Sequence, residues 1–239
     1  TVGMATGPIK LTFEANQPDW LDHMKLGEIG RQTLPYLGLL DCGRKTHEIP
    51  SNFVWGSNFS IRKSLLMEAG GFHPCAMPWD LLHYFGDGEI HVGRHVVNQG
   101  YKVIYHPEAL VFHDIPSNRL NLKAVALKFE TTAYARSFQT LRNLGKAYQS
   151  PTKQEIASIA DRYFCNPLST PVNLREAVMS GLSHGFNQHL RCFQSDLNFR
   201  LWVLRENYLD LDASYKNPIL SAYGVTKSNS LDWRHGIDR

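Results

Sequence analysis

The sequence predicts an α/β domain followed by a helical subdomain. Up to Pro116, short β-prone runs alternate with amphipathic segments, and Gly and Pro residues separate them. Beyond it, apolar residues beginning with Leu120 and Leu122 recur at roughly helical spacing. We therefore expect one domain over 1–116 and a helical subdomain with a tail over 117–239. The 239 residues are enough for a sizeable hydrophobic core.

The N-terminal quarter is expected to hold one strand and one long helix. A β-prone run covers 9–13, directly after a Gly-Pro pair. Asp19 and a loose stripe of apolar residues after it predict a helix over about 18–37, because an acidic residue favours a helix start. A polar loop over 41–50 follows.

The central segment is expected to alternate between strands and helices. A strand over 53–61, interrupted by a glycine, precedes a helix over 62–69 that a Gly-Gly pair ends. An irregular, aromatic-rich stretch then leads to an amphipathic helix over 87–100. Two short strands over 101–105 and 109–113 complete the domain.

Three helical stretches are expected in the second half. The first follows Asn118 and ends before a Ser-Pro pair, the second covers about 153–164 and the third about 173–208. The remaining residues lack periodicity and are expected to form an extended tail. Within that tail, Asp210-Leu-Asp212 follows no strand, and we interpret it as a solvated pair rather than a metal-binding motif.

Charge and cysteine content exclude some classes of function. The net charge is only +3 and no long Lys/Arg run occurs, so nucleic acid is not the expected partner. The four cysteines include no Cys-x-x-Cys pair, which argues against a thiolate zinc site and suits a reduced, cytoplasmic protein. No apolar run is long enough to span a bilayer, although mild basicity would suit a phosphate-bearing substrate or contact with a membrane surface.

Chemistry-bearing motifs concentrate in one stretch of about 60 residues. A small-residue loop, Trp55-Gly-Ser-Asn58, comes first; an acidic turn, Gly86-Asp-Gly-Glu89, opens a helix; and a strand ends at His113. This order and spacing resemble the acceptor-side half of a family-2 glycosyltransferase with the Rossmann-like GT-A fold. The resemblance covers roughly 3–116, and it implies that a carboxylate of the turn removes a proton from a sugar hydroxyl.

The acidic turn offers two candidate bases. The family usually has Glu-Asp followed two residues later by another acid, and an Arg further on, which Arg94 matches. Gly88 occupies the slot of the family's catalytic Asp, so the resemblance implies Asp87 as the base, with Glu89 second. From the residues alone, Asp87 can equally be a helix cap, and Arg94 either pairs with the acids or is a solvated surface residue.

The small-residue loop and the aromatic stretch offer ligand contacts. Gly56 and Ser57 would let the backbone approach a ligand, Trp55 could stack on a sugar face, and the resemblance places this loop, through Asn58, beneath the acceptor. The alternative is a bulge in a buried strand with the Trp in the core. Trp79 is a second candidate stacking platform.

His113 is the candidate metal ligand. A His at the end of a strand is often a hydrogen-bonded structural residue. In many GT-A enzymes, however, a His at the corresponding place binds the divalent metal, Mn or Mg, that neutralises the donor diphosphate. The resemblance therefore implies a metal-dependent reaction with His113 as one ligand.

The implied activity is hexosyl transfer with inversion, from a nucleotide-sugar to a saccharide or lipid-linked acceptor, as in polysaccharide biosynthesis. The chain carries no nucleotide-binding βαβ unit and no Asp-x-Asp after a strand, so we expect a preceding segment to supply them and the isolated chain to be inactive. The helical half would close over the acceptor or mediate homo-oligomerisation, and its basic residues, Arg119, Lys123, Arg136 and Arg142, would meet phosphate or lipid head groups or form a solvated face. The rival interpretation is a non-catalytic module that binds glycans or a partner chain.

Overall fold

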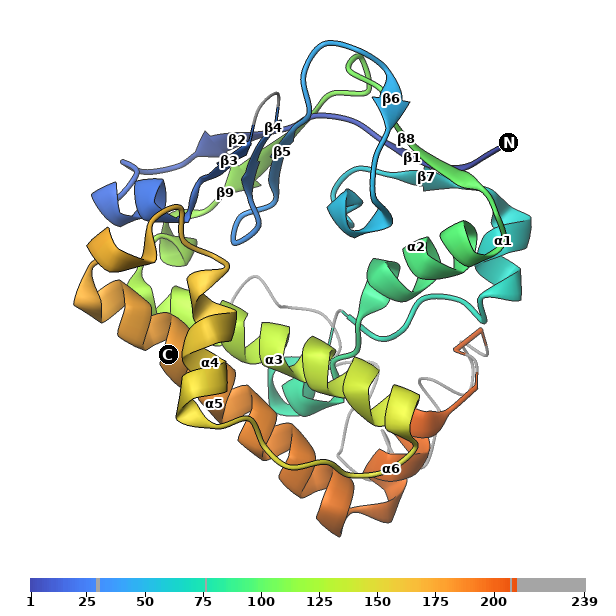
Figure 1. Cartoon of the computed structure of the whole chain (residues 1–239), viewed down its shortest axis with the longest axis vertical. Coiled ribbons are helices and arrows are strands. Elements are labelled where there is room, and N and C mark those ends of the chain that lie inside the picture. The colour runs from blue at the N-terminus through green and yellow to red at the C-terminus, as the bar shows by residue number, and fades with distance from the viewer. Residues whose placement is uncertain (29–30, 76, 207, 210–239) are drawn as a thin grey trace.

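Two parallel strand pairs form the frame of the first half (Figure 1). The computed structural model describes residues 1–28, 31–75, 77–206 and 208–209. Strand β1 (Val2–Thr6) pairs in parallel with β8 (Lys102–Tyr105), and β2 (Ile9–Phe13) pairs in parallel with β9 (Val111–Ile115). Residues 7–8 separate β1 from β2, and residues 106–110 separate β8 from β9. The two connections pack tightly against each other, since a Cβ at Gly7 would lie 2.2 Å from the carbonyl oxygen of Ala109. Only glycine allows this approach.

Each strand pair belongs to its own small mixed sheet. One sheet has the order β6-β8-β1-β7 and the other the order β3-β4-β5-β2-β9. The added strands are β3 (Leu26–Glu28), β4 (Arg31–Leu34), β5 (Leu39–Asp41), β6 (His47–Glu48) and β7 (Ser60–Ile61). The first half is therefore mixed α/β, as expected.

Two predicted helices of the first half are confirmed. Helix α1 spans Lys63–Glu68 and helix α2 spans Gly88–Asn98. Val92 and Val96 of α2 are fully buried, but Val97, which the sequence pattern also placed inward, is exposed. The predicted strands at 9–13, 101–105 and 109–113 are confirmed as β2, β8 and β9, with shifts of one or two residues.

The predicted helix over 18–37 is wrong. A short 3-10 helix, η1 (Asp19–Met24), is followed by the antiparallel strands β3 and β4. Leu21, Met24 and Leu34 are buried, but Leu21 and Leu34 reach the core from different elements. Two glycines in the middle of this run weaken a helix, and the spacing of the apolar residues does not reveal that.

The predicted strand over 53–61 is mostly a turn. A 3-10 turn, η2 (Ser51–Phe53), and a bend closed by a hydrogen bond of 3.0 Å from Asn58 N to Trp55 O leave only β7 as strand. The irregular stretch before α2 contains a third 3-10 helix, η3 (Trp79–Tyr84).

The second half is helical, as predicted. It contains α3 (Leu122–Leu144), α4 (Lys153–Asp161), α5 (Val172–Ser195) and α6 (Leu197–Leu204), with the short 3-10 turns η4 (Ser117–Arg119) and η5 (Pro167–Ser169). The side chain of Asn121 caps α3, and Gly145 ends it in the left-handed conformation. The single helix expected over 173–208 is divided at Asp196, whose carboxylate accepts hydrogen bonds from the first turn of α6.

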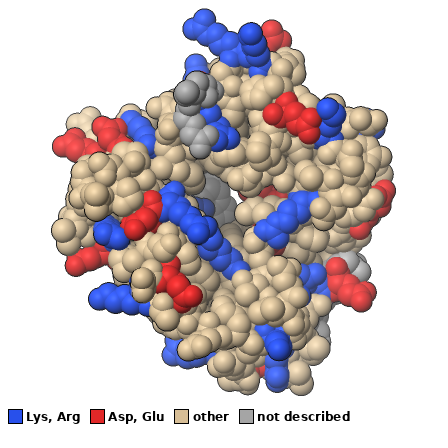
Figure 2. Space-filling model, viewed as in Figure 1, with Lys and Arg blue, Asp and Glu red and all other residues tan. Residues whose placement is uncertain are grey.

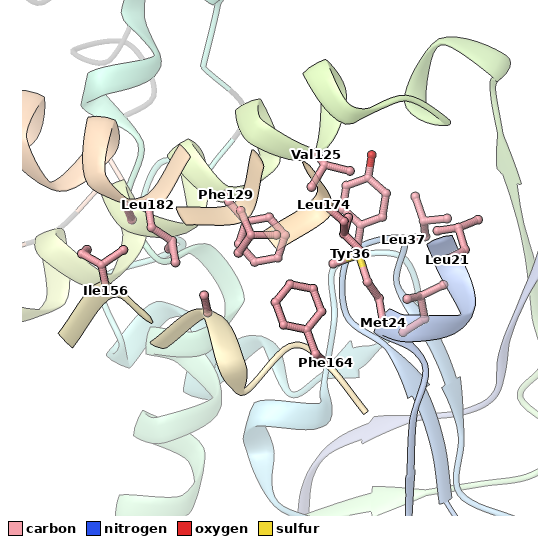
Figure 3. Packing of buried hydrophobic residues seen from close by; sticks show 14 of the residues in the cluster. Leu21, Met24, Tyr36, Leu37, Val125, Phe129, Ile156, Phe164, Leu174 and Leu182 are labelled. Atoms are coloured by element: carbon pink, nitrogen blue, oxygen red, sulfur yellow. The ribbon is translucent and has the colours of Figure 1, made fainter. Parts of the chain in front are cut away.

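The largest hydrophobic cluster joins the two halves (Figure 3). Leu21, Met24 and Leu37 from the first half meet Val125 of α3 and Leu174 of α5. The change near Pro116 is thus a change of secondary structure, and the core is continuous across it. None of the described helices combines the length and apolar character needed to cross a bilayer. Asp210-Leu-Asp212 and the tail expected after it lie outside the described residues.

Candidate functional site

The acidic turn places its two carboxylates in different environments. Asp87 is the residue before α2, but its side chain makes no cap hydrogen bond. It is 5 % exposed, and its Oδ1 shares a hydrogen bond with Nδ1 of the buried His73. Burial lowers the pKa of His73, and the ring of His91 stacks on it with 3.8 Å between centroids. Asp87 therefore holds the interior together, and in this arrangement a substrate hydroxyl does not reach it.

Glu89 points instead to the small-residue loop. Its Oε1 accepts a hydrogen bond of 3.0 Å from the backbone N–H of Gly56. The carboxylate is half-buried, and Gly56 is exposed. This bond joins two segments 33 residues apart and brings the second candidate base to the loop that the sequence analysis expected beneath the acceptor.

Gly88 is required by the fold. It adopts φ +47°, and a Cβ there would lie 2.9 Å from Cβ and 3.1 Å from Sγ of Cys75. An Asp in this slot, as in the family pattern, would be strained and would collide with Cys75. The side chain of Cys75 packs against this turn, although the residue is exposed on its other side.

The other end of the loop meets His113. A Cβ on Gly38 would lie 3.5 Å from Nδ1 of His113 and 3.8 Å from Oγ of Ser57, so these side chains face the same point from β9 and the loop. Gly38 itself has φ +81°, which favours glycine there. Glu89 thus meets the Trp55–Asn58 bend at Gly56, and His113 lies near it on the side of Ser57.

Asn58 braces the loop rather than facing a ligand. Its side-chain amide donates hydrogen bonds to the carbonyl oxygens of Pro8 and Ala109, at 3.2 and 2.7 Å. Pro8 lies between β1 and β2, and Ala109 lies between β8 and β9. The carbonyl of Asn58 accepts a hydrogen bond of 2.5 Å from Oγ1 of Thr6. The loop is therefore fixed to the end of β1 and to the residues that precede β2 and β9.

Trp55, Trp79 and Arg94 are the remaining residues that were expected to contact the substrate. Trp55 is half-buried against the core, with its indole N–H donating to the Asn52 carbonyl at 3.2 Å. Trp79 is the first residue of η3. Arg94 donates a hydrogen bond of 2.5 Å to Gln139 of α3 and, among the described residues, pairs with neither acid of the turn. It ties α2 to the helical half.

His113 alone does not make a metal site. In the described part of the chain no group of three or more His, Cys, Asp or Glu side chains could hold a metal ion. Burial lowers the pKa of His113, and the positive charge of Arg119 lowers it further. The neighbouring Asp114 accepts a hydrogen bond from Thr12 on an exposed position. Among the described residues, His113 therefore has no companions that would complete a divalent-cation site.

Lys128 of the helical half lies within electrostatic range of Glu89. Figure 2 shows a hollow in the centre of the molecule with Lys and Arg side chains on both sides. Half-buried Lys128 of α3 has its pKa lowered by burial and by Arg119, while the Glu89 carboxylate acts in the opposite direction. Sequence reasoning missed Lys128. No pattern in the neighbouring residues distinguishes it from other lysines of the helix.

Arg136 and Arg142 bond to other residues of the helical half. Arg142 donates to the carbonyl oxygens of Val203 and Arg205, at 2.7 and 2.6 Å, and Arg136 donates to Tyr163 at 3.2 Å. These two are therefore structural residues.

No family model, no curated protein and no solved structure matches this chain. A functional assignment therefore rests on the residues of the site and their geometry.

Proposed function

We propose that this chain is the acceptor-side part of an inverting glycosyltransferase, with Glu89 as the catalytic base. The observation that carries the proposal is the hydrogen bond between Glu89 Oε1 and Gly56 N, because it places a partly exposed carboxylate against an exposed loop of small residues. Such a loop lets a sugar approach the backbone closely.

The reaction would proceed in one displacement. The Glu89 carboxylate takes the proton from the acceptor hydroxyl while the acceptor oxygen forms a bond to the anomeric carbon. The bond from that carbon to the donor phosphate oxygen breaks, and the nucleoside diphosphate leaves with the electron pair. A positioned base of this kind contributes a factor of about 10²–10⁴ to the rate.

Asp87, the first choice from the sequence, has a supporting role in this proposal. Its carboxylate is bonded to His73 in the interior, so it would hold the first turn of α2 in place and thereby orient Glu89. The divalent metal, with His113 as one ligand, and a GT-A arrangement of the whole enzyme stay parts of the proposal.

The test is sugar transfer by the full-length gene product, with a panel of nucleotide-sugars and saccharide or lipid-linked acceptors. Glu89→Gln keeps the side-chain oxygen that accepts from Gly56 but removes the base, so we expect donor binding to persist and turnover to fall by about 10²–10⁴. Asp87→Asn should lower the melting temperature. Full turnover in Glu89→Gln would contradict the assignment.

A second candidate function is a non-catalytic glycan-binding module. The observation that favours it is Gly88, whose conformation and contact with Cys75 exclude the family's usual acid from its slot. Such a module would bind oligosaccharides equally well as wild type and as Glu89→Gln, and it would turn over no donor.

A further inference from the structure

One face of α5, the long orange helix of Figure 1, carries an open groove lined by polar side chains. The groove has a volume of about 570 Å³. Its lining residues are Ser180, Ser183, His184, Asn187 and Arg191. They recur at spacings of three and four residues, so they lie on one face of the helix and extend over about 16 Å along its axis. The groove can therefore hold a ligand longer than a single ion.

The opposite face of α5 fixes this helix in the core. Leu182 and Phe186 are buried there. A Cβ at Gly181 or Gly185 would lie 2.0 or 2.5 Å from a carbonyl oxygen of α3, so the two helices are in close contact. Because the helix is held rigidly, the spacing of the lining side chains is set before any ligand binds, which lowers the cost of ordering the site.

Side-chain hydrogen bonds orient the middle of the groove. Oδ1 of Asn187 accepts a hydrogen bond of 2.7 Å from Oγ of Ser150, which lies in the connection between α3 and α4. Nδ2 of Asn187 donates to Oγ of Ser183 at 3.4 Å. An amide nitrogen carries two hydrogens, so Asn187 can donate a second hydrogen bond to a ligand in the groove.

Arg191 gives one end of the groove a positive charge. Its side chain is exposed and, among the residues that the structure describes, forms no salt bridge. The carboxylate of Glu130 lies 3.7 Å from Nε2 of His184, but it is half-buried and already accepts a hydrogen bond of 2.6 Å from the Tyr134 hydroxyl. The groove thus presents hydroxyl and amide donors along its length and a guanidinium at one end.

We propose that this groove binds an acidic sugar. Arg191 would pair with the carboxylate or phosphate group of the sugar, because a guanidinium forms two parallel hydrogen bonds with either oxyanion. The serine and asparagine side chains would bond to the sugar hydroxyls. Most small-molecule sites are lined by apolar side chains with few polar groups, so a polar lining suits a ligand that is itself hydroxylated. The choice of a saccharide rests on the proposed function, and the groove shares no lining residue with the Trp55–Asn58 loop.

The experiment is calorimetric titration of the full chain, at low and high salt, with digalacturonate and glucose 6-phosphate as probes. We expect binding that weakens as the salt concentration rises. Maltose, a neutral disaccharide, should bind at least about tenfold more weakly, because it lacks the charge that pairs with Arg191. Binding of one acidic probe alone would identify the oxyanion as carboxylate or as phosphate, and either result supports the site.

Three variants test the residues of the groove. Arg191→Gln should weaken binding of the acidic probes by about tenfold or more, and Asn187→Ala should weaken it by about three- to tenfold. Arg200→Gln is the matched control, because Arg200 is an exposed arginine of α6 that does not line the groove. It should change the affinity by less than about twofold. All three positions are exposed, and the melting temperature of each variant reports that it is folded.

Three results would overturn the proposal. They are no binding of either acidic probe at millimolar concentration, maltose binding as tightly as the acidic probes, or equal weakening by Arg191→Gln and Arg200→Gln. Because these titrations need no donor, they are separate from the test of the proposed reaction. Glu89→Gln should lose transfer and keep binding in the groove. Binding in the groove without transfer from any donor would leave this site standing and overturn the glycosyltransferase proposal.

Discussion

Replacing Gly181 by Ala tests the close packing of α3 against α5. A Cβ at Gly181 would lie 2.0 Å from the carbonyl oxygen of Ala126 and 3.1 Å from the backbone nitrogen of Glu130. These obstacles are backbone atoms of α3, so no side-chain rotation removes them. One turn further, a Cβ at Gly185 would lie 2.5 Å from the Glu130 carbonyl oxygen, which shows that the two helices touch along a line.

The magnitude results from two opposing effects. Ordinary van der Waals contact starts at 3.4 Å, so α5 must move away from α3 by about 1.4 Å. This movement would loosen the packing of Val178 and Leu182, the buried neighbours of Gly181. Overpacking of a well-packed interior costs about 1–3 kcal/mol and more when backbone must move, whereas Ala favours a helix over Gly by about 1 kcal/mol. We expect a net loss of about 2 kcal/mol, which lowers the melting temperature of a domain of this size by about 4–8 °C.

Thermal and urea denaturation followed by circular dichroism measure this change. Ser180→Ala is the control, because Ser180 is an exposed neighbour on the same helix and already carries a Cβ. It should leave the melting temperature unchanged within about 2 °C. If Gly181→Ala melted at or above the temperature of the control, the helices could not approach each other as closely as described.

Three further predictions concern stability. Burial, with a smaller effect of nearby His83, lowers the pKa of His189 to about 3, so this ring is neutral when folded and gains a proton on unfolding below its ordinary pKa of 6.5. The neutral ring therefore costs no stability above about pH 6.5, and the protein loses stability as the pH falls below that value. The free energy of unfolding of wild type, measured by urea denaturation, should fall by about 2 kcal/mol between pH 6.5 and 5, and that of His189→Gln should fall less. Thr152→Ala removes the capping box of α4 and should lower unfolding free energy by about 1 kcal/mol, whereas Lys153→Ala, at the next position, should change it little. Asn58→Ala leaves two backbone carbonyls at the strand breaks without their donor and should cost about 1–3 kcal/mol, seen as a lower melting temperature; an unchanged value would contradict the bracing role.

The sequence determined those elements whose pattern is local. Helix α2 shows buried Val92 and Val96 on one face, and α3 was expected after Asn118 and before a Ser-Pro pair, so each could be located from neighbouring residues alone. The change from mixed α/β to helical structure near Pro116 was visible for the same reason. The segment over 18–37 was not predictable, because apolar residues spaced for a helix are equally buried by a hairpin that packs against distant helices.

Only the tertiary structure decided which side chains meet. In the sequence, Asp87 and Glu89 carry the same charge two residues apart. In the structure, Asp87 shares a hydrogen bond with His73 in the interior, whereas Glu89 accepts a hydrogen bond from the backbone of Gly56 at the exposed loop. Lys128 looked like any lysine of a surface helix until folding brought it near Glu89. A carboxylate or an ammonium acquires its chemical role from the charges and the water around it, and these come from segments that only folding places side by side.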